Sequence, residues 1–431
     1  MKVVIVGAGG REHALADVCH RQGHEVLVSP GNAGIPWSIL TPPEELDADL
    51  FVIGPEQPLV DGLADKLREQ GKLVFGPGTE GAKIEGSKAF MKELVASSGA
   101  PTARYEVVRT VEELDRVLPS FFQGDNPGAV VKTDGLAAGK GVTVCESIVK
   151  ARADAVAKLS GESFGDSGKE IVIEALLGKA DLSDCYERSV FALVSVTQQG
   201  VQRQLIPVMA QDYKRVSSDP TSPMTGGMGC WAPTGDEDKL EEWAQVCIDP
   251  VLAEMQKRGI DYVGFMYIGL MIVDGMPYVL EINVRFGDPE AEVLLPLITS
   301  DFAAAMRAAA SGETIPPIHC SKACAVTVVL AAKGYPEKPV KGDVIFGLRD
   351  ILNEPPAGVS VYCAGVDDSG FADIFLTNGG RVAEVTAIGF TGPVARHRAY
   401  DAAGRIDFMA SREVPRRSSK VYRTDIADHW A

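Results

Sequence analysis

The sequence contains no apolar run long enough to cross a membrane as a helix. Such a helix needs about 20 apolar residues, whereas the longest apolar runs here are short segments such as residues 325–332. The apolar residues 1–6 lead directly into glycines, without the cleavage region of a secretory signal. We therefore expect a cytoplasmic protein without a membrane partner.

Positive charge is also scarce. The chain has 42 Lys and Arg residues against 59 Asp and Glu residues, which gives a formal net charge of −17. Proteins that bind nucleic acids generally carry the opposite balance. We therefore predict no nucleic-acid partner.

Paired cysteines are missing as well. The 8 cysteines are scattered along the chain and form no CxxC pair, so a disulfide framework is not predicted. His319, Cys320 and Cys324 resemble half of a zinc site, but no second Cys/His pair follows at zinc spacing. We expect reduced, mostly buried thiols.

A chain of 431 residues, 45% of them hydrophobic, has room for about three domains. In the first 100 residues, short apolar runs alternate with helical patterns at residues 11–21 and 59–70. The expected strands are residues 3–6, 25–28, 50–53 and 72–75. This alternation predicts a parallel sheet with a ligand cleft at the carboxyl ends of its strands, where glycine-bearing loops follow.

The rest of the chain divides into two further regions. A hairpin is predicted where residues 263–273 and 276–284 flank Asp274 and Gly275, a strong turn signal. After about residue 321, short strands and turns indicate a compact β-rich region. We predict an α/β (α+β) fold with domains at residues 1–100, 101–320 and 321–431, and a small subdomain at about 119–187 within the second.

The second strand of that hairpin carries polar side chains on an otherwise apolar segment. Because successive side chains alternate between faces, Glu281, Asn283 and Arg285 share one face, and apolar residues such as Leu280 share the other. Hard oxygen donors one pleat apart suit Mg²⁺, whose remaining ligands are usually phosphates and water. The alternative is the polar outer face of an edge strand.

Two lysines lie beside glycine-rich segments. Lys132 ends a buried strand and precedes the small residues 133–141, whose amide groups could approach a phosphate closely. Lys88 opens a helix, where amide groups favour anions. Neither segment matches the P-loop pattern GxxxxGK[ST]. A hairpin turn and a helix cap are the structural alternatives.

A charged segment, residues 211–215, precedes the glycine-rich turn at residues 225–229. It places Asp212 beside Lys214 and Arg215. Paired cations next to a carboxylate could hold an anionic substrate that also bears an amine. A cluster of exposed surface charges is the alternative.

A series of motifs from residue 3 to about residue 403 resembles one enzyme family in order and spacing. These are GAGGREHA (7–14), PGNAG (30–34), GPEQPLV (54–60), EGSKAFMK (85–92), KTDGLAAGKGV (132–142), QDYKR (211–215), TGGMG (225–229), GFMYIGLM (264–271), EINVRFGDPE (281–290) and TNGGR (377–381). Together they resemble the ATP-grasp ligases and, within them, the phosphoribosylamine-glycine ligase family.

The resemblance implies a preATP-grasp domain, an ATP-grasp body with a small mobile lid, and a C-terminal β-rich domain. It also implies a reaction of ATP, glycine and 5-phosphoribosylamine that gives glycinamide ribonucleotide, ADP and phosphate, the second step of purine synthesis. The family route passes through glycyl phosphate and uses Mg²⁺ or Mn²⁺. We expect a monomer and leave a homodimer open.

Site residues follow from the resemblance position by position. ATP is expected at Lys88, Lys132, Asp134, Gly135, Gly139, Lys140, Gly141, Glu174, Leu177 and Glu187. Substrate contacts are expected at Gly9, Gly10, Asn32, Pro55, Glu56, Asp212, Lys214, Arg215 and Asp288. Catalytic roles are expected for Arg285, Asp212 and Lys132, and metal ligation for Glu281 and Asn283.

The chain departs from the family pattern after Glu174, where residues 175–178 lack the usual acidic residues, and Glu187 is the best remaining match for the ribose ligand. A nicotinamide-dependent dehydrogenase is a rival interpretation, but its GxGxxG fingerprint fails because Glu12 stands at the last glycine position. Two further rivals are a non-catalytic nucleotide-binding protein and an ATP-grasp ligase that acts on a different acid, such as formate or bicarbonate.

Overall fold

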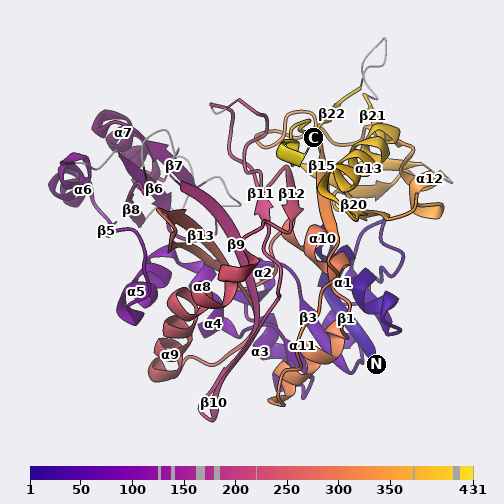
Figure 1. Ribbon diagram of the computed structural model, residues 1–431, viewed down its shortest axis with the longest axis horizontal. Coiled ribbons are helices and arrows are strands. Elements are labelled where there is room, and N and C mark those ends of the chain that lie inside the picture. Colours follow the sequence, from indigo (N-terminus) through magenta and orange to yellow (C-terminus); the bar gives the residue numbers. More distant parts are fainter. Residues whose placement is uncertain are drawn as a thin grey trace.

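The computed structural model describes residues 1–124, 128–136, 141–161, 170–178, 185–219, 221–371, 374–410 and 418–430. Figure 1 shows a small sheet with helices α6 and α7 on one side of the molecule and the C-terminal elements β15, β20 and α13 on the other. A longer antiparallel sheet lies between them. Within the described residues, no helix is both long and apolar enough to cross a membrane.

The N-terminal sheet is parallel, as predicted, with strand order β2-β1-β3-β4. Its strands are β1 (Lys2–Gly7), β2 (Glu25–Pro30), β3 (Leu50–Ile53) and β4 (Val74–Phe75). Helix α1 (Gly10–Arg21) connects β1 to β2. All four residues of β3 are buried, because a central parallel strand is covered on both faces.

The single helix predicted over residues 59–70 is wrong. The chain forms two helices instead, α2 (Glu56–Val60) and α3 (Leu63–Glu69). Gly62 separates them with a left-handed φ of +83° and caps α3. Glycine adopts this conformation without a steric penalty, so it can interrupt an otherwise helical pattern.

Two helices lead from the N-terminal sheet into the rest of the chain, α4 (Thr79–Gly86) and α5 (Lys88–Ser98). Ser87 separates them and its hydroxyl accepts a hydrogen bond from the Phe90 amide at 3.1 Å, which caps α5. Lys88 is therefore fixed in the first turn of α5.

The small sheet has strand order β5-β8-β6-β7 and its neighbours are antiparallel. Its elements are β5 (Tyr105–Val108), α6 (Val111–Val117), β6 (Ala129–Thr133), β7 (Val142–Cys145), α7 (Ile148–Leu159) and β8 (Ile171–Ala175). The sheet and its helices enclose a hydrophobic core of their own, which includes Phe121 and Ile173. Lys132 and Glu174 lie on the neighbouring strands β6 and β8.

The long antiparallel sheet has strand order β10-β9-β13-β14. Its strands are β9 (Cys185–Thr197), β10 (Gly200–Leu205), β13 (Tyr262–Val273) and β14 (Met276–Asn283). Helices α8 (Leu240–Cys247), α9 (Asp249–Arg258), α10 (Glu290–Leu294) and α11 (Phe302–Ser311) belong to the same part of the chain. The predicted hairpin is confirmed, and Asp274 and Gly275 adopt left-handed φ values of +50° and +80° at its turn.

A β-bulge interrupts β14 at Leu280. Gly269 pairs with Glu281, but Leu270 pairs with Val279, so Leu280 is the extra residue. Val279 therefore joins Ile282 in the core, and Leu280 does not. The prediction that Leu280 shares the apolar face with Ile282 is wrong, because strict alternation fails at a bulge.

The C-terminal region contains two sheets, one ordered β11-β12-β15-β20-β17 with β22 added to β15, and one ordered β18-β19-β16-β21. The strands of the first are β11 (Gln211–Asp212), β12 (Gly229–Ala232), β15 (Cys324–Ala332), β17 (Val359–Cys363), β20 (Arg381–Gly389) and β22 (Lys420–Val421). The second contains β16 (Val344–Phe346), β18 (Val366–Asp368), β19 (Phe375–Thr377) and β21 (Asp407–Met409), and helices α12 (Leu348–Asn353) and α13 (Gly392–Arg405) complete the region. Strands β11 and β12 come from the middle of the sequence, so the charged segment at residues 211–215 lies where the two regions join.

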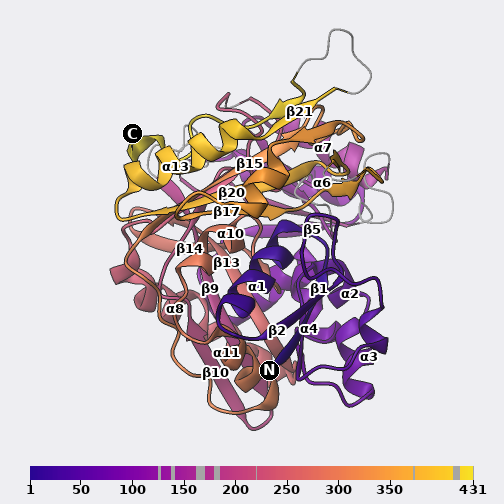
Figure 2. The same cartoon turned by 90° about the vertical axis from the view of Figure 1, so that its right-hand side faces the viewer.

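The N-terminal and C-terminal parts of the chain also meet directly. Figure 2 shows α1 beneath β17 and α10, and α1 contacts both elements. The buried ring of His13 in α1 accepts a hydrogen bond from the Cys363 amide at its Nδ1, at 2.9 Å. Burial lowers the pKa of His13 to about 3, so the ring is neutral at neutral pH.

Candidate active site

Two lysines flank one buried glutamate on β8, a central strand of the small sheet. Glu174 Oε1 lies 2.6 Å from Lys132 Nζ, and Glu174 Oε2 lies 2.7 Å from Lys92 Nζ. Burial would raise the pKa of Glu174, but Lys132 and Lys92 outweigh it and hold the pKa below its ordinary value. The carboxylate is therefore ionised and fully occupied by protein cations. Leu177 follows β8 by two residues and is half-buried.

The glycine-rich loop after β6 begins against the start of α5. Lys88 Nζ donates a hydrogen bond to the Gly135 carbonyl at 2.7 Å. Asp134 accepts bonds from the Ser87 hydroxyl at 3.1 Å and the Ala89 amide at 2.9 Å. The structure therefore brings together the two segments in which lysines were predicted to bind phosphate. The predicted residues Gly139 and Lys140 lie outside the described residues, and the Gly141 carbonyl accepts a bond from the Thr133 amide at 2.9 Å.

Glu281 lies in a field of positive charge. Burial would raise its pKa, but Lys214, Lys132, Arg285 and Lys88 outweigh burial and hold the pKa below its ordinary value. The four cations come from separate segments of the chain. An ionised carboxylate therefore lies near both the lysines predicted to bind phosphate and the charged segment at residues 211–215.

Glu281 and Asn283 fit a divalent cation in the chemistry of their donors, an ionised carboxylate and an amide. Asn283 Oδ1 also accepts a hydrogen bond from Arg285 Nη2 at 3.3 Å. Within the described ranges, no three His, Cys, Asp or Glu residues cluster in a way that could hold a metal ion. A cation here would need further ligands from substrate and water, which is usual for Mg²⁺.

Arg285 is held between carboxylates of the N-terminal third of the chain. Its Nη2 lies 2.8 Å from Glu85 Oε1, and its Nε lies 3.3 Å from Glu56 Oε2. Although burial opposes the shift, Arg285 and Arg11 lower the pKa of Glu56 to about 2. Glu56 is therefore an ionised link between the N-terminal domain and the end of β14, and Pro55 directly before it caps α2.

The first glycine loop is already filled by a carboxylate. Glu12 Oε2 accepts a hydrogen bond from the Gly9 amide at 2.7 Å, and Glu12 Oε1 lies 2.6 Å from Arg11 Nε. A dinucleotide pyrophosphate at this turn would meet the Glu12 carboxylate, which argues against the dehydrogenase interpretation. A Cβ at Gly10 would clash with Glu384 Oε2, so close packing requires glycine there. Asn32 Nδ2 donates to the carbonyls of Ala8, Cys363 and Ala364.

The charged segment at residues 211–215 contains a buried ion pair. Lys214 Nζ lies 2.7 Å from Asp212 Oδ2, and the Asp212 side chain is only 3% exposed. Glu290 is also buried nearby, and burial together with the charge of Asp212 raises its pKa. Glu187, on β9, also lies near the Asp212 carboxylate, but it is exposed. Arg215 Nη1 instead donates to the Ser222 carbonyl at 2.6 Å, within its own loop.

Asp288 is anchored from the C-terminal region. Arg381 Nη2 lies 3.0 Å from Asp288 Oδ2, and Arg381 Nη1 donates to the Asp288 carbonyl at 2.8 Å. A Cβ at Gly226 would lie 3.2 Å from the same guanidinium. Arg381 therefore links Gly226 of the TGGMG motif to Asp288 of the EINVRFGDPE motif. In the sequence it is only the last residue of the TNGGR motif.

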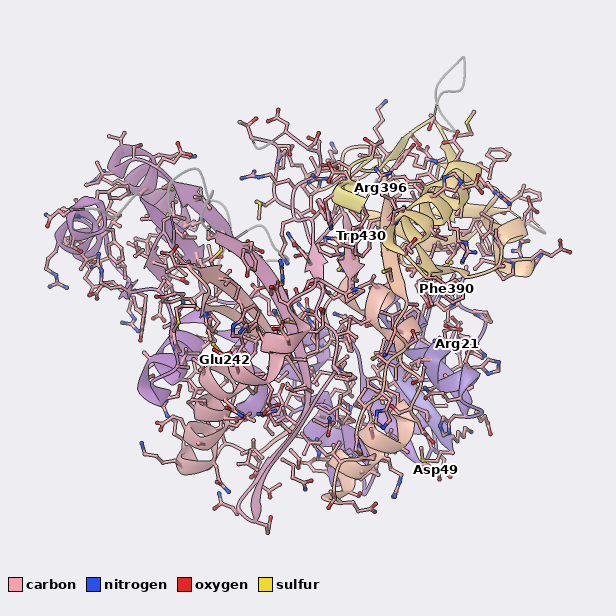
Figure 3. All side chains as sticks on the ribbon, viewed as in Figure 1. Arg21, Asp49, Glu242, Phe390, Arg396 and Trp430 are labelled. Atoms are coloured by element: carbon pink, nitrogen blue, oxygen red, sulfur yellow. The ribbon has the colours of Figure 1, made fainter. Side chains whose placement is uncertain are left out.

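The C-terminal tail packs onto the charged segment. Its basic segment, residues 412–423, is predicted from its charge to be a solvated end. In the structure the Arg423 guanidinium instead lies over the Tyr213 ring at 4.9 Å and donates to the Arg215 carbonyl at 3.1 Å. The rings of Trp430 and Trp231 lie 4.7 Å apart, and Figure 3 places Trp430 beside β12. The prediction of a solvated end is wrong at Arg423.

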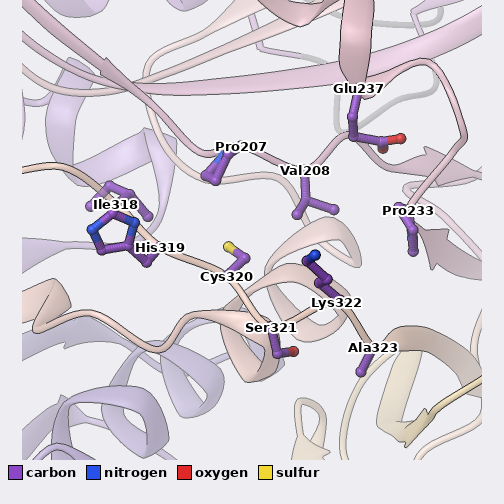
Figure 4. A pocket seen from close by; sticks show the side chains of 10 residues that line it. All are labelled: Pro207, Val208, Pro233, Glu237, Ile318, His319, Cys320, Ser321, Lys322 and Ala323. Atoms are coloured by element: carbon purple, nitrogen blue, oxygen red, sulfur yellow. The ribbon is translucent and has the colours of Figure 1, made fainter.

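A separate surface pocket lies away from the predicted site residues (Figure 4). It is lined by Pro207, Val208, Pro233, Glu237, Ile318, His319, Cys320, Ser321, Lys322 and Ala323. The Glu237 carboxylate is occupied by the backbone amides of Met209, Thr234 and Gly235. With no three-residue metal cluster in the described part of the chain, His319 and Cys320 line this pocket without forming a zinc site.

Family models cover most of the chain. The model described as the N domain of phosphoribosylglycinamide synthetase matches residues 1–85, the ATP-grasp (A) domain matches residues 86–291, and the C domain matches residues 325–429. The chain is 38% identical to a phosphoribosylamine-glycine ligase of Streptomyces coelicolor over 99% of both chains. It is 39% identical to the enzyme of that name from Xylella fastidiosa strain Temecula1, over 93% of both chains.

Solved structures agree with these matches. The crystal structure of a phosphoribosylamine-glycine ligase from Thermotoga maritima superposes with a TM-score of 0.81 and 34% identity, covering 99% of this chain and 100% of that one. The biotin carboxylase domain of Hydrogenobacter thermophilus 2-oxoglutarate carboxylase shares the fold, with a TM-score of 0.68 and 14% identity over 94% of this chain and 90% of that one. The resemblance drawn from the motifs is confirmed, and the chain belongs to the phosphoribosylglycinamide synthetase family.

Proposed function

We propose that this chain ligates glycine to 5-phosphoribosylamine at the expense of ATP, as a step of purine biosynthesis. One observation carries the proposal. Glu281 is held ionised by cations from separate segments, which are Lys88, Lys132, Lys214 and Arg285. A reaction that gathers a triphosphate, a carboxylate and a ribose phosphate needs such a concentration of positive charge around one metal-binding carboxylate.

The reaction divides into two displacements. A carboxylate oxygen of glycine attacks the γ-phosphorus of ATP, and ADP leaves with the electrons of the broken bond. The amine of phosphoribosylamine then attacks the carbonyl carbon of glycyl phosphate, loses a proton and expels phosphate. The first displacement is required because a carboxylate oxygen is too poor a leaving group for an amine to displace.

We assign the triphosphate to Lys88 and Lys132, next to Asp134 and Gly135. The adenine would meet the backbone that runs from Glu174 to Leu177, since the Glu174 carboxylate already binds two lysines. Glu187 would contact the ribose of ATP. Its exposed position near Glu281 and Asp212 supports this assignment.

We assign a divalent cation, Mg²⁺ or Mn²⁺, to Glu281 and Asn283. When bound, the cation would supply a Lewis acid that neutralises charge on the phosphate oxygens. Arg285 would orient the reacting carboxylate or γ-phosphate, and its two carboxylate partners, Glu85 and Glu56, hold the guanidinium plane in place.

The two remaining substrates are assigned to the charged segment at residues 211–215 and to the N-terminal domain. Asp212 would bind the glycine ammonium, a role supported by its ion pair with the Lys214 ammonium at 2.7 Å. Phosphoribosylamine would occupy the N-terminal cleft lined by Gly9, Gly10, Asn32, Pro55 and Glu56. Lys214, Arg215 and Asp288 would be further substrate contacts. Asn32 and Arg215 already bond to backbone carbonyls, so their contribution would be to loop shape as much as to direct contact.

The experiment that tests this proposal measures ADP release with one acid and one amine at a time. ADP release should require both glycine and freshly prepared phosphoribosylamine. Release with formate or bicarbonate in place of glycine would instead indicate another ATP-grasp ligase. ADP release that is indifferent to glycine would contradict the proposal.

A further inference from the structure

Lys92 is a lysine with no access to solvent. It lies on α5 four residues after Lys88, and its side chain is 0% exposed. Its ammonium is 2.7 Å from Glu174 Oε2 and donates to Thr102 Oγ1, also at 2.7 Å. The Thr102 hydroxyl in turn donates to the Val279 carbonyl of β14 at 2.7 Å. Lys92 therefore connects α5, β8 and β14.

A fully buried ammonium is costly unless it is paired, and a long apolar side chain would fill the same space more cheaply. Burial lowers the pKa of Lys92 to about 8, with Lys132 adding to the shift and Glu174 opposing it. The position thus keeps a charge that its surroundings disfavour. Lys92 shares its partner, Glu174, with Lys132, and this sharing gives the buried charge a functional reason.

Lys132 has limited capacity for a ligand. A lysine ammonium has three donors. Lys132 Nζ donates one of them to the Leu280 carbonyl at 3.2 Å. It also lies 2.6 Å from Glu174 Oε1, so Glu174 shares the ammonium with any bound phosphate. If Glu174 had no second cation, its whole negative charge would fall on Lys132 and compete with that phosphate.

We propose that Lys92 is a positioning residue for nucleotide phosphates, because it shares the charge of Glu174 and so leaves Lys132 a net positive charge for the ligand. This inference rests on the proposed role of Lys132 in ATP binding. The triad of Lys92, Glu174 and Lys132 carries one net positive charge, whereas Glu174 and Lys132 alone carry none. The bulge at Leu280 contributes by presenting its carbonyl to the same ammonium.

Nucleotide binding tests the inference without the ligation reaction. Competition against a fluorescent nucleotide would give dissociation constants for a non-hydrolysable ATP analogue and for adenosine. Lys92→Met should weaken binding of the ATP analogue by about 10- to 100-fold, the range for a lost charge-assisted hydrogen bond, and leave adenosine binding within about twofold. A residue with only a structural role would weaken both ligands alike.

The double variant K92M/E174Q provides the decisive comparison. Removing the Glu174 charge leaves the Lys132 charge available to the phosphates again. The ratio of the dissociation constants for the ATP analogue and adenosine should therefore return toward that of the unaltered chain. The double variant also removes both members of one buried ion pair and so stays testable if Lys92→Met alone does not fold. Thermal unfolding would be recorded for every variant.

Lys158→Met serves as the matched control. Lys158 is also a buried lysine with a carboxylate partner, Asp154, at 2.6 Å, but it does not contact Glu174. Its substitution should lower the melting temperature and leave the ATP-to-adenosine ratio unchanged. The inference fails if K92M leaves that ratio unchanged, or if K92M/E174Q binds the ATP analogue no better than K92M. Since glycine is absent, neither outcome depends on whether ligation is observed.

Discussion

Arg285 and Glu85 form a buried ion pair, with Nη2 and Oε1 2.8 Å apart. The pair joins a residue just after β14 to the last turn of α4, and Glu85 Oε2 also accepts a hydrogen bond from the Val284 amide at 2.8 Å. One carboxylate therefore fixes both the backbone and the side chain beside the candidate metal ligands.

Glu85→Gln is expected to lower kcat by about 10- to 100-fold, because it removes the charge that orients Arg285 while keeping an oxygen for the Val284 amide. Steady-state kinetics with varied glycine would measure the effect. Glu80→Gln, on the same helix and paired only with exposed Lys83, is the control and should behave as the unaltered enzyme. An unchanged kcat in Glu85→Gln would show that Glu85 does not orient Arg285 for catalysis.

Glu281→Gln and Asn283→Ala should each reduce turnover by roughly 100-fold or more while the protein stays folded. Both side chains belong to the polar end of β14, and the core residues of this strand are unaffected by either change. Turnover at increasing Mn²⁺ concentration and the melting temperature would be measured together. Full activity in either variant would place the metal elsewhere.

Asp212→Asn should raise the KM for glycine by about tenfold or more, because it removes the negative charge assigned to the glycine ammonium. The dissociation constant of the ATP analogue should change little. Asp219→Asn, in an exposed part of the same loop, is the matched control. An Asp212→Asn enzyme that loses affinity for ATP and keeps its KM for glycine would show that Asp212 supports ATP binding and does not bind glycine.

Glu292 and Glu384 predict an unusual pH dependence of stability. Both are fully buried, and within the described residues neither carboxylate has a hydrogen-bond partner. Burial and Asp288 raise the pKa of each well above its ordinary value, with Arg381 opposing. A raised pKa in the folded state means that stability is complete below the ordinary glutamate pKa of about 4.3 and is lost as the pH rises through the folded-state pKa.

Glu384→Gln should therefore increase the free energy of unfolding at pH 9 by about 1–3 kcal/mol, and by much less at pH 5. Denaturant unfolding at both pH values would measure the difference. Glu25→Gln, at an exposed strand end, should show no such pH dependence. A Glu384→Gln protein that is less stable than the unaltered chain at pH 9 would show that the ionised Glu384 carboxylate stabilises the fold.

The sequence predicted those parts of the fold whose conformation depends only on residues adjacent in the chain. The turn at Asp274 and Gly275 is an example, because its left-handed geometry depends on two residues alone. The bulge at Leu280 could not be read from strand periodicity, since it depends on the register with β13.

The same limit applied to the candidate site. Lys132 and Glu281 stood out because charged residues on apolar strands are conspicuous. Lys92 and Arg381 did not, although Lys92 lies one helical turn after Lys88 and could have been found from that spacing. Their partners, Glu174 and Asp288, are far away in the sequence, and only the folded chain brings them together.

The most direct test of the proposed chemistry uses glycine labelled with ¹⁸O in its carboxylate. Attack of that carboxylate on ATP and later release of phosphate transfer one carboxylate oxygen from glycine to phosphate. The account predicts inorganic phosphate with one ¹⁸O atom per turnover, detected by mass spectrometry, together with glycinamide ribonucleotide that has lost one label. Phosphate without ¹⁸O would contradict it.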